Sequence, residues 1–235
     1  MIKNLLRTFL LLTGTTVAFF SCVNLDTEEQ VVADAYICSR IIGSDTMYVF
    51  GGYVNASTTM KSITLTNPDA SRSIDLKILD YYGYYFERPI GDADYNSSKP
   101  QNGNYQFSIV YGDGTTSNVT NIVSSDILSP INLTEVKTDT INQSITVKWG
   151  KNSSADCYVA RFYKNDTVIY ISNEIDPGYS SMIVYTYSSG WNSNITLHSG
   201  DSLKVEISGI LYESDYSSLV QSVSFSKKIG FAWPE

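Results

Sequence analysis

Ile-Thr-Val-Lys-Trp, residues 145–149, and Tyr-Val-Ala-Arg-Phe, residues 158–162, are the two stretches that decide the fold of this chain. In both, apolar or aromatic side chains recur at every second position, which is the period of a β-strand with one buried face. A large aromatic side chain from one sheet fills the layer between two packed sheets. Trp149 and Tyr158 therefore predict the core of a β-sandwich.

Further strand patterns surround this pair. A proline after a completed strand cannot donate to a ladder and often opens the next domain, so Ser129-Pro130 is the predicted boundary. After it, β-rich segments follow at 131–136, 145–149, 158–163, 168–171, 182–187, 203–207 and 220–225. We predict a sandwich over residues 129–235.

This second domain resembles a fibronectin type III domain. That family carries a buried Trp on its second strand and a buried Tyr on its third, which here are Trp149 and Tyr158. It also has a tyrosine corner at the start of the sixth strand. Leu203 stands at that position here, so the corner hydrogen bond is expected to be missing.

A first sandwich is predicted over residues 31–128. Strand patterns cover 35–42, 47–54, 61–66, 74–78, 105–109 and 118–123. Gly51-Gly52 predicts a bulge or bend in the second strand, and Ile74, Leu76 and Ile78 are predicted to face inward. The domain resembles related immunoglobulin-like modules, in which Tyr105 is expected to supply the corner.

Composition agrees with an all-β chain. Tyrosine occurs 18 times, and Thr, Ser, Val and Ile are abundant, whereas long stretches of Ala, Leu, Glu and Lys at helical spacing are absent. The net charge is −8, and it becomes −10 if a signal carrying Lys3 and Arg7 is removed, which leaves 14 of the 16 basic residues against 24 acidic ones. Nucleic acid is therefore not expected as a partner.

The first residues are typical of a secretion signal. Lys3 and Arg7 precede an apolar run from Phe9 to Phe20, which is short for a membrane helix and is followed by Ser21 and Cys22. The stretch that ends at Cys22 resembles a bacterial lipobox, although Phe19 and Phe20 differ from the residues usual in that motif. The resemblance implies that the signal is cleaved before Cys22 and that Cys22 is lipidated. The alternative is an ordinary secreted protein that is cut elsewhere, with Cys22 as a spare thiol.

Residues 1–21 are thus predicted to be a lipoprotein signal peptide and residues 22–30 a flexible tether. Asp26, Glu28 and Glu29 are similar to the export signal of Bacteroides-type surface lipoproteins. The resemblance implies a lipid-anchored protein of the outer membrane, displayed on the cell surface.

Catalysis, cofactors and metals are not expected. His198 is the one histidine and lies in a loop pattern, and residue types alone do not make a Ser-His-Asp triad. Asp92-x-Asp94-x-Asn96 imitates the start of a calcium loop, but Ser97 and Gly103 stand where Gly and Glu are needed. Cys38 and Cys157 fall in different domains and are expected to be free, buried thiols.

Three aromatic residues are the candidates for ligand binding. Tyr81 and Tyr85 flank Gly83 in a tyrosine-rich cluster and are predicted to face solvent, where they could form a platform for a sugar ring. The alternative is edge decoration or packing against the second domain. Trp191, in a polar loop, either caps the end of the sandwich or contacts a ligand.

These features favour a non-catalytic cell-surface lipoprotein that acts as an interaction, adhesion or stalk module. The alternative is a carbohydrate-binding accessory lipoprotein of a glycan uptake system. The expected partners are the membrane, through the lipid anchor, and a glycan or protein ligand.

Overall fold

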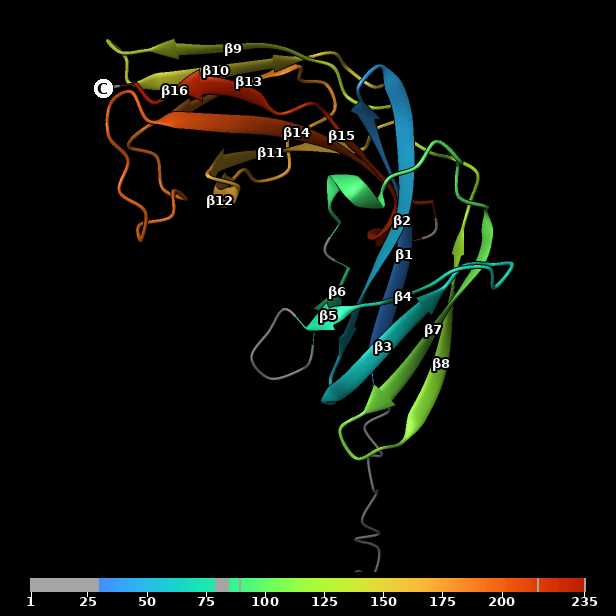
Figure 1. The fold of residues 1–235 in the computed structure, drawn as a ribbon. Helices are drawn as coiled ribbons and strands as arrows, with labels where there is room; N and C mark the ends of the chain where they lie inside the picture. The colour runs from blue at the N-terminus through green and yellow to red at the C-terminus, as the bar shows by residue number, and fades with distance from the viewer. Residues whose placement is uncertain (1–29, 79–84, 89, 215, 235) are drawn as a thin grey trace, which may run out of the picture. The chain divides into compact units, whose positions relative to one another are not determined.

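The computed structural model describes residues 30–78, 85–88, 90–214 and 216–234, without the side chains of 85–86 and 216–218. Residues Val31–Glu235 pack as one compact unit, shown in Figure 1. Within the described residues the regular structure is β, apart from one 3-10 turn, η1 (Asp92–Asp94). None of the helices in this part of the chain is long and apolar enough to cross a membrane.

The first sandwich is built before residue 128. Its strands are β1 (Val31–Ile42), β2 (Asp45–Ala56), β3 (Met60–Thr66), β4 (Ser73–Asp75), β5 (Lys77–Ile78), β6 (Tyr85–Glu87), β7 (Gly103–Tyr111) and β8 (Thr116–Val123). One sheet has the order β4-β3-β7-β8, and β1 and β2 belong to the opposing sheet. Alternate side chains of both sheets, among them Ile37, Phe50 and Phe107, meet in a buried core.

The second sandwich has its own core. Its strands are β9 (Leu133–Asp139), β10 (Ser144–Trp149), β11 (Cys157–Lys164), β12 (Thr167–Ile171), β13 (Ser181–Tyr185), β14 (Ser202–Glu213), β15 (Tyr216–Phe225) and β16 (Ile229–Ala232). β13, β10 and β9 form one sheet, and β11, β12, β14 and β15 lie in the other. Trp149 and Tyr158 meet edge to face with their ring centroids 5.4 Å apart, as predicted.

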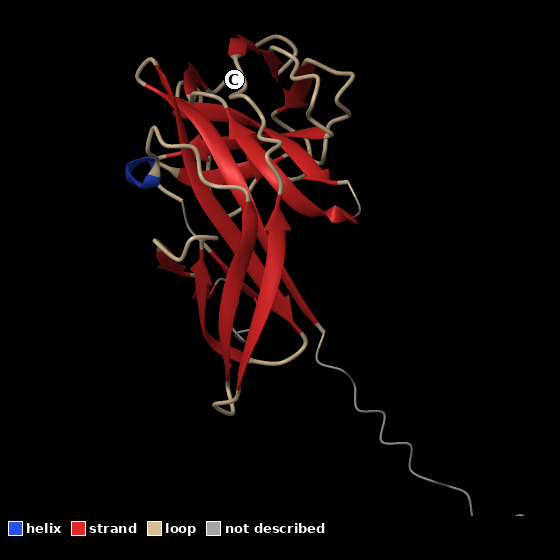
Figure 2. Ribbon diagram, turned by 90° about the vertical axis from the view of Figure 1, so that its right-hand side faces the viewer, coloured by secondary structure: helices blue, strands red, loops and turns tan. Residues whose placement is uncertain are grey.

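The two sandwiches share a sheet, which the sequence patterns did not predict. β1 pairs in parallel with β15, from Ile37 opposite Ser222 to Arg40 opposite Phe225. The joined sheet runs β12-β11-β14-β15-β1-β2-β6-β5, with β16 paired to β14. The long strands that cross from one half to the other are visible in Figures 1 and 2. We call this β1–β15 contact the joint.

Buried serine side chains fix the joint. Ser39 Oγ donates to the carbonyl oxygen of Leu128 at 2.6 Å, and Ser222 Oγ donates to that of Ile37 at 3.0 Å. The backbone N–H of Leu128 donates to Ser222 Oγ at 3.1 Å. The connection between the sandwiches is therefore pinned to both β1 and β15. On the other face of the sheet, Tyr36, Cys38, Val49 and Tyr95 form a third buried cluster, against which Val223 and Phe225 pack.

The tyrosine corner is present where it was predicted. Tyr105 is fully buried, and its hydroxyl donates to the carbonyl oxygen of Gln101 at 2.9 Å. In the second sandwich Leu203 is fully buried, at the position where the corner tyrosine is missing. There the hydroxyl of Tyr158 bonds the backbone N–H and carbonyl of Asn152, at 2.7 and 3.2 Å, and so ties down the connection from β10.

Of the bulge or bend predicted at Gly51-Gly52, the bulge is wrong, because β2 pairs with β1 along its whole length without a register shift. The glycines allow close packing instead. A Cβ on Gly51 would lie 2.9 Å from the Tyr36 ring, and one on Gly52 would lie 2.8 Å from the Leu65 side chain.

The predicted inward position of Ile78 is also wrong, since 49% of that residue is exposed. The strand changes sheet at this point: β4 pairs with β3, whereas β5 pairs with β6 of the nine-stranded sheet. Leu76 is buried between them. The period of two is therefore broken after Leu76.

Candidate functional site

The predicted site residues are placed unevenly. Cys22 and Tyr81 lie outside the described residues. Tyr85 begins β6, where its backbone pairs with Asn55 of β2, and its side chain is outside the description. The platform predicted from Tyr81 and Tyr85 thus stays a prediction.

Trp191 packs on the core of the second sandwich. Its ring centroid lies 4.7 Å from that of Tyr170, 5.3 Å from that of Phe162 and 4.8 Å from that of Trp233. Its indole N–H donates to the carbonyl oxygen of Tyr185 at 3.0 Å. These contacts are those of the capping alternative, and a ligand contact at Trp191 remains a prediction.

An exposed aromatic pair lies beside it that sequence reasoning missed. The rings of Tyr185 and Tyr187 stack with centroids 5.2 Å apart and an interplanar angle of 26°. Tyr185 is 39% exposed and Tyr187 71% exposed. The available signal was Tyr-Thr-Tyr within the predicted strand 182–187, because residues two apart on a strand point to the same face, although β13 itself ends at Tyr185.

The groups considered for catalysis or metal binding have other partners. The backbone N–H of His198, not its ring, donates to Asp201 at 2.8 Å. Asp201 also holds Lys164 at 2.7 Å, and this ammonium lowers the pKa of the carboxyl. Asp94 accepts from Arg88 at 2.9 Å and from the Gly91 N–H at 2.8 Å. Among the described residues, no cluster of His, Cys, Asp and Glu could hold a metal ion.

Cys38 and Cys157 are both free and buried, as expected. Burial raises the pKa of the Cys38 thiol to about 12 and raises that of Cys157 as well. At neutral pH these thiols are protonated, so they pack as small apolar groups.

One hollow lies on the outer face of the nine-stranded sheet and has a volume of about 770 Å³. We call it the outer hollow. Arg40 pairs there with both Asp92 and Glu206, and the Tyr163 hydroxyl donates to Glu206 at 2.8 Å. Arg88 lies in the same hollow and is held by Asp94. Its main charges are thus compensated within the protein.

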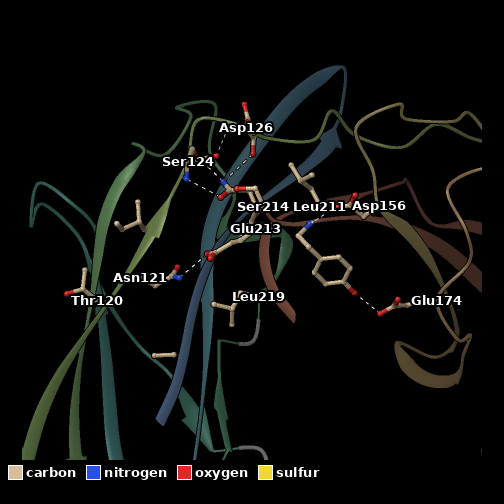
Figure 3. A pocket seen from close by; sticks show the side chains of 14 residues that line it. Thr120, Asn121, Ser124, Asp126, Asp156, Glu174, Leu211, Glu213, Ser214 and Leu219 are labelled. Atoms are coloured by element: carbon tan, nitrogen blue, oxygen red, sulfur yellow. Dashed lines mark hydrogen bonds between the residues drawn. The ribbon is translucent and has the colours of Figure 1, made fainter. Parts of the chain in front are cut away.

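A larger cleft, of about 1170 Å³, lies between β8 and the β14–β15 hairpin (Figure 3). We call it the joint cleft. One wall comes from the first sandwich and the other from the second, so each sandwich alone would present half of it. The residues that line it are Ala33, Thr120, Asn121, Ile122, Ser124, Asp126, Asp156, Glu174, Leu211, Tyr212, Glu213, Ser214, Leu219 and Gln221.

The joint cleft is acidic. Glu174 accepts the Tyr212 hydroxyl at 2.6 Å, Asp156 accepts the Tyr212 N–H at 2.8 Å, and Glu213 accepts the Asn121 amide at 2.9 Å. These donors are neutral. Neither these carboxylates nor Asp126 makes an ion pair within the described part of the chain, and the cleft's described lining includes no Lys or Arg. Four negative charges therefore remain uncompensated.

Asn121 sets the floor of the joint cleft. It is buried on β8, its side-chain oxygen accepts the N–H of Ala35 at 3.0 Å, and its amide donates to Glu213. Beside it on β1, the fully buried Asp34 accepts the N–H of Val220 at 2.6 Å. Burial, with a smaller contribution from the nearby Glu213, raises the pKa of Asp34 to about 7, although the bond from the Val220 N–H acts in the opposite direction.

Two immunoglobulin-like, fibronectin type III-like β-sandwiches in tandem are the class that these strands, cores and corner define. No protein-family model matches the chain, and no curated protein matches it. Among solved structures, it is similar to a segment of two fibronectin type III domains from chicken tenascin, with 10% identity and a TM-score of 0.28 over 88% of this chain and 98% of that one.

Two further solved structures are similar at the same level. The FN1–FN3 domains of chicken CNTN1 match with 12% identity and a TM-score of 0.30, over 88% of this chain and 66% of that one. Murine CEACAM1b matches with 10% identity and a TM-score of 0.25, over 83% of this chain and 98% of that one.

Proposed function

We propose that this protein is a non-catalytic cell-surface lipoprotein that acts as an interaction or adhesion module. The observation that carries the proposal is the joint cleft, a large concave surface whose two walls are fixed relative to each other by β1 and β15. Concave surfaces with a few convergent polar groups are the usual binding sites of proteins. The cleft's carboxylates, which have no ion pair within the described residues, are available to bind positively charged groups of a partner.

The anchor is the second part of the proposal: Cys22 is lipidated and holds the protein at the outer face of a Bacteroides-type outer membrane. The support is the basic, apolar and Ser21-Cys22 succession at the amino terminus. Replacing Cys22 with Ser should abolish labelling by radioactive palmitate and move the protein from the detergent phase to the aqueous phase. Labelled Cys22→Ser protein in the detergent phase contradicts the anchor.

Binding at the joint cleft is tested by cross-linking on intact cells. A photoreactive benzoylphenylalanine at Thr120, which lines the cleft, should give discrete adducts of higher mass. The same group at the exposed Lys137 on β9 is the matched control and should give none. Adducts from both positions, or from neither, contradict an interaction through the cleft.

The second candidate function is a carbohydrate-binding accessory lipoprotein of a glycan uptake system. The observation that favours it is the exposed Tyr185–Tyr187 pair, because aromatic rings offer faces on which a sugar ring can stack. Tyr81, Tyr85 and Trp191 are further candidates for it. A glycan array should show binding by the wild type that is lost when Tyr185 and Tyr187 are both Ala. An array without any signal for the wild type removes this candidate.

A further inference from the structure

The edge of β8 is an open strand edge inside the joint cleft. β8 is the last strand of the sheet β4-β3-β7-β8, and its other side pairs with β7. Thr120, Ile122 and Ser124, which alternate along this edge, all line the cleft. Because backbone groups of alternate residues in an antiparallel strand point to the same side, the N–H and C=O of these residues share one direction.

Gln221 shows which direction that is. Its side-chain oxygen accepts the N–H of Ser124 at 3.1 Å, and its side-chain nitrogen donates to the carbonyl oxygen of Ser124 at 3.1 Å. Gln221 is only 4% exposed and reaches this edge from β15. Its amide thus stands where a peptide group of a neighbouring strand would stand. By alternation, the N–H and C=O of Thr120 and Ile122 face the cleft in the same way.

The charge of the cleft selects the partner. An unpaired strand edge accepts an extended polypeptide through main-chain hydrogen bonds, and the surrounding side chains decide which sequence is accepted. Here the opposite wall and the rim carry Asp126, Asp156, Glu174 and Glu213, and none of these carboxylates has a cation partner among the residues that the structure describes. Lysine or arginine side chains on an added strand would fill that need, whereas an acidic strand would be repelled.

We propose that the joint cleft binds an extended, cationic polypeptide segment, which adds to β8 as a strand beyond the position that Gln221 occupies. The eight residues of β8 span about 26 Å, which suits a segment of roughly six to eight residues. The proposal rests on the proposed interaction function, and it names the class of partner for that function.

The test uses purified Cys22→Ser protein without its signal and a capped, fluorescent peptide of four Lys-Thr repeats. Anisotropy should report saturable binding. The same peptide with the backbone nitrogen of every residue methylated keeps its charge but has no N–H left to pair on either edge of the strand, and it should not bind. A peptide of four Glu-Thr repeats is the charge control. Amide shifts should change at Thr120 and Ile122, the residues whose backbone groups face the cleft.

Matched variants separate the cleft from general acidity. Asp126→Asn with Glu174→Gln should weaken binding of the lysine peptide roughly tenfold, since two exposed ion pairs are lost. Gln at 174 still accepts the Tyr212 hydroxyl, so the wall is retained. Asp75→Asn with Glu135→Gln removes the same charge from β4 and β9, outside the cleft, and should leave the affinity unchanged.

Three results overturn the proposal. Equal binding of the N-methylated and unmodified lysine peptides means simple cation attraction without strand addition. If both pairs of variants weaken peptide binding equally, the peptide is attracted by the overall negative charge and not by the joint cleft. Absence of binding by the lysine peptide, while Thr120 still gives cross-linked adducts on cells, means that the cleft takes another class of partner and leaves the interaction function standing. Absence of both contradicts the interaction function itself.

Discussion

Replacing Arg40 with Met should destabilise the protein by about 3–5 kcal/mol, because it leaves Glu206 as a buried carboxylate without its cation. The Arg40 side chain is 15% exposed and that of Glu206 is 2% exposed. Arg40 belongs to β1 and Glu206 to β14, so the pair joins the first sandwich to the second. Met retains most of the apolar contact of Arg40 with the Tyr95 and Phe225 rings.

Two further variants divide that cost. Asp92→Asn removes the exposed partner of Arg40, which is 73% exposed, and should cost at most about 1 kcal/mol. Glu206→Gln combined with Arg40→Met removes both buried charges while the side-chain oxygen still accepts the Tyr163 hydroxyl. The double variant should therefore recover about 2 kcal/mol or more relative to Arg40→Met alone.

The assay is urea unfolding at neutral pH of Cys22→Ser protein without its signal, followed by circular dichroism. The free energy of unfolding is compared at a constant denaturant slope, since a changed slope would mean that the exposed surface had changed. If Arg40→Met lowers the free energy of unfolding by less than about 1 kcal/mol, the reasoning is refuted, because the loss of a solvent-exposed ion pair would have the same effect. A double variant as unstable as Arg40→Met refutes it too, since then Glu206 was not the group left unpaired.

Three other changes give separate tests. Burial raises the pKa of Asp34 from 3.8 to about 7, so the folded protein favours the protonated acid and loses about 4 kcal/mol of stability as the pH rises from 4 to 8. Asp34→Asn should be the more stable protein at pH 8, with no difference near pH 4; urea titrations that differ equally at both pH values contradict this. Tyr105→Phe should cost about 1 kcal/mol through loss of the bond to Gln101, measured by thermal unfolding against wild type, and a neutral result denies the corner a role. Residues 130–235 alone should give a dispersed amide spectrum, with faster hydrogen exchange in β15 than in the full chain; a collapsed spectrum contradicts independent folding of the second half.

Strands and local aromatic contacts could be predicted because their signals lie within a few residues. The alternation around Trp149 and Tyr158 placed both rings in one core, and their observed contact follows from it. The Tyr105 corner depends on a hydroxyl and a carbonyl four residues apart, so it too is encoded locally. Ile78 shows the limit of the same rule, because its strand leaves one sheet for another.

The joint and its cleft could not be predicted, because they depend on pairing between β1 and β15, which are nearly 200 residues apart. No local pattern distinguishes a strand that pairs within its own sandwich from one that pairs with its neighbour. One signal was available: Asp34 stands within the apolar stretch Val31–Ile37. A carboxyl at that position needs a partner when it is buried, and the partner is the Val220 N–H across the joint.

A last prediction connects the joint with binding. If the link between the sandwiches were flexible, the two walls of the joint cleft would become ordered only when a ligand binds, and this ordering would reduce the affinity. The hydrogen bonds of Ser39 and Ser222 to Leu128 instead hold the walls in place before binding. Arg40→Met changes no residue of the joint cleft, because the Arg40–Glu206 ion pair that it removes lies in the outer hollow. The substitution should nevertheless weaken binding of the lysine peptide, and amide hydrogen exchange should become faster in β1 and β15. If exchange quickens there while peptide affinity is unchanged, the cleft does not depend on the joint for its shape, and β8 alone is sufficient to receive the strand.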